Sequence, residues 1–274
     1  MKRYIFAADV DGTILMDDGQ VHPATLEVCK LARAQGHIIV LSTGRSVKRT
    51  LSVLKKLPDV DFFVCNNGTV VYDCQNDQDI FIKGLSPQYY PKIVDFARTH
   101  GFNFKLHTNR DWIGDVGIED ELPTLLTAEL DQQIRHHIFT HPEDPYLFNG
   151  QIPTQMSVNA SAELCAKYLR QFQNWFAQEA TVFLANDIYI DVNPQGVSKW
   201  IGLEKLAHHL NLPTNQIVTF GDSTNDLEML LGAKEHGYAM ANSKPELAKV
   251  IPPKIGTNNS DAIAKTILRY IQSN

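Results

Sequence analysis

The stretch that decides the fold is FAADVDGTIL, residues 6–15, in which an apolar run leads directly into two aspartates. Asp9 and Asp11 stand two positions apart, and Gly12 follows at once. Like charges this close repel each other, and aspartate and glycine are poor residues for continuing a strand. Residues two apart in a strand share a face, so both carboxylates can address one ligand, and Gly12 lets the chain turn close to it. The stretch therefore predicts a buried strand that ends at a binding site.

The composition is that of an ordinary globular protein with one large domain or two modest ones. The chain has 274 residues, of which 43% are hydrophobic and 20% charged, and its formal net charge is −6. This charge argues against nucleic acid or an anionic membrane as the main partner. The sequence shows no membrane-spanning run and no signal-peptide pattern, and its four cysteines form no CxxC pair. We expect a soluble, cytoplasmic protein with free thiols.

The outer thirds of the chain alternate strands with helices. The first third predicts strands at 4–10, 37–42 and 61–65, separated by helices at 22–36 and 46–57. The last third predicts helices at 198–212, 224–233 and 261–271 and strands at 216–220 and 237–241. This alternation favours an α/β fold, a doubly wound parallel sheet with helices on its faces.

The middle third has a different rhythm and predicts an inserted domain. Helices are expected at 86–100 and 161–178, and strands at 102–108, 136–141, 153–159, 181–185 and 187–191. Runs of strands without regular crossovers favour an α+β unit with an antiparallel sheet. We therefore expect a core of residues 1–84 and 190–274, interrupted by a cap domain at 85–189. His137 and His141 fall on one of these predicted strands, where a structural role is favoured over zinc binding.

Polar or acidic residues and small turns follow every predicted strand of the core. These segments are Asp9–Thr13, Ser42–Arg45, Asn66–Gly68, Gly221–Asp226 and Asn242–Ser243. Ligands of open α/β sheets bind beyond the carboxyl ends of the strands, so we expect the segments to meet at one site. The acids there, Asp9, Asp11, Asp222 and Asp226, would repel one another without a positive charge among them. A Mg²⁺ ion, together with Lys199 as the expected nearby cation, would supply that charge.

The other groups expected at this edge suit a phosphoryl group. The Thr43 hydroxyl and the backbone amides at Gly12 and Gly44 can hold phosphate oxygens. An aspartate can serve as a covalent nucleophile, and a second acid can exchange the proton. Together these groups predict a phosphoryl-transfer site.

Four segments in order carry a resemblance to a known family. They are DVDGT at 9–13, STGR at 42–45, GVSK at 196–199 and GDSTND at 221–226. With them the sequence resembles the haloacid dehalogenase-like (HAD) phosphatase superfamily, in its Cof-type branch with a large inserted α/β cap (class IIB). The resemblance covers essentially the whole chain, and the cap insertion falls between the second and third segments.

The resemblance implies a role for each of these residues. Asp9 would form an aspartyl-phosphate, and Asp11 would protonate the leaving oxygen and then activate the attacking water. Mg²⁺ would be bound by Asp9, the backbone carbonyl of Asp11 and Asp222, and Asp226 would complete or orient that metal site. Thr43 and Lys199 would hold the phosphoryl group, with Gly12, Gly44, Arg45 and Asn225 as further substrate-binding positions.

The leading hypothesis is a Mg²⁺-dependent phosphatase for a small phosphorylated metabolite, such as a sugar phosphate, with no obligate protein partner. A phosphomutase of the same superfamily stays open, because it would return the phosphoryl group to the substrate. A halide-releasing hydrolase needs no general acid beside the nucleophile, so Asp11 counts against it. A non-catalytic phosphometabolite sensor predicts a broken motif, and all four motifs are intact.

Overall fold

The computed structural model describes residues 2–115, 124–142, 144, 150–185 and 187–272. The chain divides into two compact units, a core of Met1–Phe81 with Ser198–Asn274 and an inserted unit of Ile82–Val197. The junctions expected from the sequence are 84/85 and 189/190. The second junction lies later because strand β11 (Tyr189–Pro194) pairs along its length with strands of the inserted unit.

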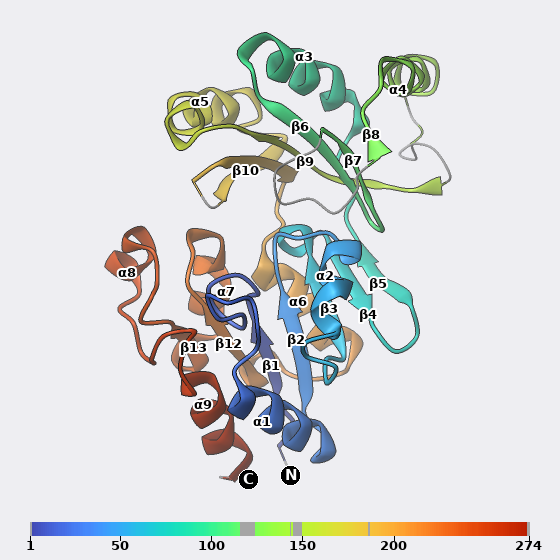
Figure 1. The fold of residues 1–274 in the computed structure, drawn as a ribbon. Helices are drawn as coiled ribbons and strands as arrows, with labels where there is room; N and C mark the ends of the chain where they lie inside the picture. The colour runs from blue at the N-terminus through green and yellow to red at the C-terminus, as the bar shows by residue number, and fades with distance from the viewer. Residues whose placement is uncertain (1, 116–123, 143, 145–149, 186, 273–274) are drawn as a thin grey trace. The chain divides into compact units, whose positions relative to one another are not determined.

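The core is built on a seven-stranded sheet with the order β13-β12-β1-β2-β3-β4-β5 (Figure 1). Its strands are β1 (Ile5–Ala8), β2 (Ile38–Ser42), β3 (Phe62–Cys65), β4 (Val70–Asp73), β5 (Gln78–Ile82), β12 (Ile217–Gly221) and β13 (Gly237–Ala239). The five strands from β13 to β3 are parallel neighbours, and β4 pairs antiparallel with β3. The doubly wound sheet is confirmed, with two further strands that the sequence analysis did not predict.

Helices cover both faces of the core sheet. One face carries α1 (Pro23–Ala34), α2 (Val47–Leu54) and α9 (Ala262–Gln272), and the other carries α6 (Lys199–His209), α7 (Leu227–Gly232) and α8 (Pro245–Val250). Strand β1 feeds both layers, since Phe6 and Ala8 belong to the first apolar cluster and Ile5 and Ala7 to the second. Burial on both faces explains why β1 is an unbroken apolar run in the sequence.

The inserted unit holds a six-stranded sheet with the order β10-β11-β9-β6-β7-β8. Besides β11 its strands are β6 (Asn103–Thr108), β7 (Trp112–Gly114), β8 (Thr124–Leu125), β9 (Pro153–Asn159) and β10 (Ala180–Ala185). Helices α3 (Tyr90–His100), α4 (Ala128–Thr140) and α5 (Ala162–Trp175) contribute to one apolar cluster with this sheet. Apart from β7 and β8, the strand pairs are antiparallel, so the expected α+β architecture is confirmed.

One predicted strand is wrong, because residues 136–141 lie at the end of helix α4. The hydroxyl of Thr127 caps the start of this helix by accepting from the amide of Leu130 at 3.1 Å. Ile134 and Ile138, four residues apart, form its buried face, a helical spacing that the short run HHIFTH hides. The rings of His137 and His141 stack with centroids 5.2 Å apart. Within the described residues, neither histidine joins a group of three side chains suited to hold a metal.

The cysteines are free thiols, as expected. Burial raises the pKa of both Cys29 and Cys65 to about 12, so these thiols stay protonated and act as apolar core residues. Among the described residues, no helix has the length and apolar character that a membrane span requires.

Candidate active site

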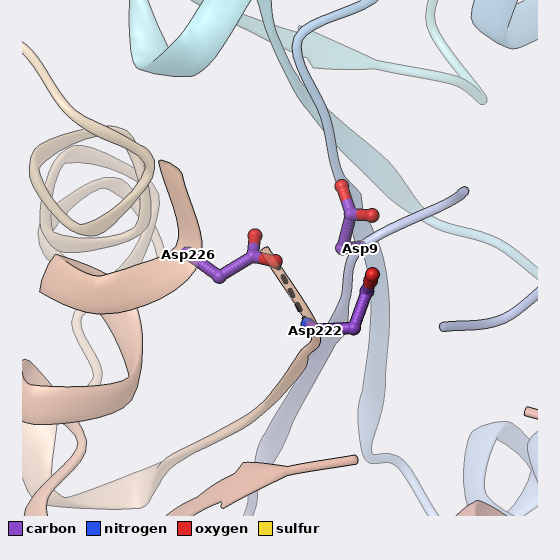
Figure 2. Close-up of side chains that lie close together, drawn as sticks. All are labelled: Asp9, Asp222 and Asp226. Atoms are coloured by element: carbon purple, nitrogen blue, oxygen red, sulfur yellow. Dashed lines mark hydrogen bonds between the residues drawn. The ribbon is translucent and has the colours of Figure 1, made fainter. Parts of the chain in front are cut away.

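The candidate site lies where the winding of the core sheet reverses. From β1 the chain proceeds through β2 and β3 on one side, whereas β12 and β13 lie on the other. Such a reversal leaves a crevice at the carboxyl ends of the two central strands. Asp9 follows β1, and its amide donates to the carbonyl of Phe220 in β12 at 3.0 Å. Asp222 follows β12, so two adjacent strands bring two carboxylates to the same edge (Figure 2).

Asp9, Asp222 and Asp226 form a buried acidic cluster at this edge (Figure 2). One oxygen of each carboxyl lies within 4.8 Å of the others, and the three residues are 6%, 6% and 0% exposed. Charged groups removed from water are costly unless they are paired. The cluster therefore requires compensating positive charge.

Lys199 supplies part of that charge from the first turn of α6. Its Nζ donates to Oδ1 of Asp9 and to Oδ1 of Asp226, both at 2.6 Å, and its side chain is fully buried. The helix start is fixed by Ser198, whose hydroxyl accepts from the amide of Ile201 at 3.4 Å. The predicted meeting of Asp9, Lys199, Asp222 and Asp226 is thus present in the structure.

One lysine does not balance three buried carboxylates. Burial raises the pKa of Asp9 well above its ordinary value, and Asp226, Asp222 and Asp11 add to the rise while Lys199 opposes it. Burial, followed by the charge of Asp226, raises the pKa of Asp222 to about 6. Burial lowers the pKa of Lys199, but Asp226 and Asp9 more than offset it, so the net pKa is raised and the ammonium stays charged.

Asp226 differs from Asp9 and Asp222 in its hydrogen bonds. Its Oδ1 accepts from Lys199, and its Oδ2 accepts from the amides of Asp222 and Ser223, both at 2.9 Å. These contacts favour an orienting role for Asp226. Asp222 accepts from the hydroxyl of Thr13 at 2.7 Å, a contact that sequence reasoning did not assign although Thr13 belongs to the first motif.

The donor set fits a hard divalent cation. It offers only oxygen ligands, carries excess negative charge and lies at the edge of a sheet where a phosphorylated ligand would bind. Asp9 and Asp222 are the side chains that would hold such an ion, with Asp226 fixing the turn that carries Asp222.

Asp11 lies in different surroundings from the cluster. Its side chain is 47% exposed. The guanidinium of Arg45 donates to both carboxylate oxygens, with Nε 2.8 Å from Oδ2. Sequence analysis placed Arg45 among the substrate-binding residues and Lys199 as the cation of all four acids. In the structure, Lys199 bonds to the buried acids Asp9 and Asp226 and Arg45 to the exposed Asp11, because Arg45 follows β2, the parallel neighbour of β1 in the sheet.

The remaining predicted residues meet around Asn67, which sequence reasoning included only within a turn. Thr43 is buried and its hydroxyl accepts from the amide of Arg45 at 3.2 Å. Asn225 donates to Oδ1 of Asn67 at 3.1 Å, and a Cβ on Gly44 would lie 3.2 Å from that same oxygen. The signal for Asn67 is its place in an Asn-Asn-Gly run after a core strand, since these residues tolerate the left-handed backbone found there, with φ of 54°.

Gly12 lies where a side chain would collide with the acidic cluster. Its φ is 77°, and a Cβ at this position would lie 2.7 Å from Oδ2 of Asp222. The turn after β1 therefore lets the backbone pass directly against the acidic cluster.

Comparisons with known proteins identify the family of the chain. The family model described as haloacid dehalogenase-like hydrolase matches residues 6–267. The chain is 29% identical to an HMP-PP phosphatase of Cronobacter sakazakii, over 97% of this chain and 94% of the relative. It is 23% identical to a 5-amino-6-(5-phospho-D-ribitylamino)uracil phosphatase of Bacillus subtilis, over 98% of both. A crystal structure of a haloacid dehalogenase-like hydrolase from Bacteroides thetaiotaomicron shares the fold, with a TM-score of 0.77, 19% identity and coverage of 98% and 100%.

Proposed function

Because the chain belongs to the haloacid dehalogenase-like hydrolase family and is a phosphatase of its Cof-type branch, we propose that it is Mg²⁺-dependent and hydrolyses a small phosphorylated metabolite through an aspartyl-phosphate on Asp9. The observation that carries this proposal is the contact at 2.6 Å between Lys199 and Asp9 inside the buried acidic cluster. This contact fixes one carboxylate oxygen and leaves the other for attack on phosphorus.

In the proposed reaction the buried Asp9 is the nucleophile and the half-exposed Asp11 is the acid and base. The second oxygen of Asp9 attacks phosphorus, the bond to the leaving oxygen breaks, and Asp11 gives that oxygen a proton. Water then attacks the phosphorus of the aspartyl-phosphate and Asp11 takes a proton from it. The bond between phosphorus and the Asp9 oxygen breaks, which restores the Asp9 carboxylate and releases inorganic phosphate. Lys199 and Thr43 hold the phosphoryl oxygens, with Gly44 and Asn225 beside them. Mg²⁺, when bound, supplies positive charge that offsets the buried carboxylates and the phosphoryl group.

The substrate is proposed only as a class. The two curated relatives are named for different substrates, HMP-PP and a phosphoribitylamino-uracil, and each is less than 30% identical to this chain. We propose a sugar phosphate or similar small phosphate ester, because the site offers groups that can hold a phosphoryl group and both relatives are named phosphatases.

The test is release of inorganic phosphate from a panel that includes both named substrates and several hexose phosphates. We expect turnover with Mg²⁺, none in EDTA, and poor turnover with Ca²⁺, which prefers longer bonds and more ligands. Full activity in Ca²⁺ alone or indifference to chelation would overturn the metal assignment. Analysis of the products from hexose 1-phosphate separates the alternatives, since an isomeric sugar phosphate in place of free phosphate would identify a phosphomutase.

We further propose that the inserted unit selects the leaving group. It carries none of the assigned catalytic residues. The face of its sheet that packs under α3, α4 and α5 is apolar, whereas the opposite face is polar. On this polar face Ser157 donates to Asp191 at 2.6 Å and Asn193 donates to Gln155 at 3.1 Å. Ordered polar side chains of this kind can distinguish substrates by their hydroxyl and amide groups.

Replacement of the inserted unit by a short Gly/Ser linker tests this second role. We expect the shortened protein, once shown by circular dichroism to be folded, to hydrolyse p-nitrophenyl phosphate slowly and to lose its discrimination among natural phosphate esters. A shortened protein that ranks natural substrates as the intact protein does would exclude the inserted unit as the specificity element.

A further inference from the structure

Three asparagines that have no assigned role hold the loop that carries Asp11. They are Asn242, after β13, and Asn258 and Asn259, before α9, and we call them the asparagine clamp. The loop is Asp11–Val21, which follows β1 and is called the catalytic loop below. The two parts of the clamp are themselves joined, because the amide of Ala241 donates to the carbonyl of Gly256 at 3.1 Å.

Asn242 contacts the catalytic loop immediately after Asp11. Its Nδ2 donates to the carbonyl of Gly12 at 2.7 Å, and its Oδ1 accepts from the amide of Asn258 at 2.9 Å. The carbonyl of Gly12 belongs to the peptide that joins it to Thr13, whose hydroxyl contacts Asp222. One side chain therefore fixes the peptide between the residue proposed to exchange the proton and the acidic cluster.

Asn258 and Asn259 hold the far part of the same loop. The Nδ2 of Asn258 donates to the carbonyl of Leu15 and to Oδ1 of Asp17, both at 3.0 Å. Asn259 forms two bonds with Asp17, donating to its Oδ2 at 2.8 Å and accepting from its amide at 3.0 Å. These bonds lower the pKa of Asp17, which therefore stays an ionised acceptor.

The exposure of Asp11 explains why its loop needs such support. Ile14 and Leu15 of the loop pack in the core, but the Asp11 side chain lies beyond the end of β1, is half in solvent and has the guanidinium of Arg45 as its partner. The loop's own turn bonds, from the amides of Ile14 and Leu15 to the carbonyls of Asp9 and Val10, tie it only to the strand it leaves. The clamp ties it to two other segments of the core.

We propose that the asparagine clamp is a positioning device that holds Asp11 where it can exchange a proton with the leaving oxygen. Asn242 is its principal member because its contact lies next to Asp11 in the chain. The inference rests on the proposed function, in which Asp11 is the acid and base. A displacement of about 1 Å is enough to cost a reacting group on the order of a hundredfold in rate.

The test compares two aryl phosphates that differ in how much they need a proton. Phenyl phosphate releases a basic phenolate, whereas p-nitrophenyl phosphate releases an anion that leaves well without protonation. For Asn242→Ala we expect kcat/KM for phenyl phosphate to fall roughly tenfold to a hundredfold, with a change below about threefold for p-nitrophenyl phosphate. Asn258→Ala, which removes different bonds to the same loop, should shift the ratio in the same direction. The matched control is Ser260→Ala, beside the clamp, whose hydroxyl donates to the carbonyl of Thr257 and not to the catalytic loop, and it should change kcat/KM for neither substrate.

Asp11→Asn separates this inference from the proposed function. If Asp11→Asn lowers kcat/KM equally for both aryl phosphates, Asp11 is not the general acid, and both the proposed role of Asp11 and the positioning role of the clamp are overturned. A second outcome is that Asp11→Asn lowers kcat/KM for phenyl phosphate selectively, while Asn242→Ala and Asn258→Ala lower kcat/KM for both substrates equally or for neither. In that case the proposed function survives and the positioning role is overturned.

Discussion

Asp9 and Asp11 are two residues apart in the sequence and lie in opposite surroundings. Asp9 is buried and bonded to a buried lysine, whereas Asp11 is half exposed and gripped by an arginine at the surface. The first sits against the packed end of the sheet, and the second sits on a loop that has left it. The comparison teaches that one short motif can place two identical acids in different electrostatic environments, the condition for giving them different chemical roles.

The largest expected effect is the loss of the buried nucleophile. Asp9→Asn removes the only oxygen nucleophile proposed for phosphorus, so activity should fall below about a hundredth of the native value. The amide keeps the shape of the side chain and removes one negative charge from an acidic cluster, so the fold should persist. Phosphate release and thermal unfolding measure the two parts. A variant that keeps more than this activity would assign the nucleophile elsewhere.

Removal of the buried cation should damage stability as well as activity. Lys199→Met leaves three buried carboxylates without their lysine, and the free energy of unfolding at pH 7 should fall by about 3–5 kcal/mol. Because the pKa values of Asp9 and Asp222 are raised, protonation should relieve part of this loss near pH 5. Denaturant unfolding at both pH values checks this, with Lys205→Met, an exposed lysine on the same helix, as the control. An equal loss for the control would show that burial of Lys199 is not the cause.

The pH dependence of stability should reveal the charge that the cluster lacks. The pKa of Asp222 rises on folding from 3.8 to about 6, so between these values the folded state holds a proton that the unfolded state has released. Stability should therefore decrease by up to about 3 kcal/mol as pH rises through this window. Saturating Mg²⁺ should stabilise the protein at pH 7 more than at pH 5. Asp222→Asn should reduce the slope, and Asp9, whose pKa is also raised by burial, should account for what remains. An unchanged slope would place the titration elsewhere.

The exposed pair should show the smallest effect on stability. Arg45→Ala breaks the contact with Asp11, but an ion pair open to solvent contributes less than about 1 kcal/mol. We expect the unfolding free energy to change by no more than this. We expect kcat/KM for phenyl phosphate to fall by about tenfold, because the Asp11 carboxylate loses the guanidinium that orients it. A large loss of stability would mean that the exposed and buried acids are not as different as their surroundings indicate.

The strands and helices that were predicted well share strong local patterns. Strand β1 is apolar on both faces, and β9 matches its predicted range because it lies in the middle of its sheet. The partly exposed strand β5 lacks such a signal, so the β4–β5 region was missed. Residues 136–141 were misread because the buried spacing of α4 begins before the stretch that suggested a strand.

The acids and the lysine of the site could be predicted because each follows a core strand or starts a core helix. Their partners could not be predicted, because these contacts join residues far apart in the chain. Thr13 and Asp222 are 209 positions apart, and Asn242 and Gly12 are 230 apart. Arg45 was expected as a substrate-binding residue, and only the structure shows that it contacts Asp11.

The tight contact between Gly68 and Ser198 bears on how this chain can change length in evolution. A Cβ on Gly68 would lie 1.9 Å from the carbonyl oxygen of Ser198, and Ser198 is the residue that caps α6 immediately before Lys199. The segment immediately before Lys199 is therefore packed against Gly68, and an insertion or deletion there would shift Lys199 away from Asp9. After the first junction, at Phe81, none of the assigned site residues occurs before Lys199. Length variation among descendants of this sequence should accordingly accumulate after Phe81 and be rare between Gly196 and Lys199.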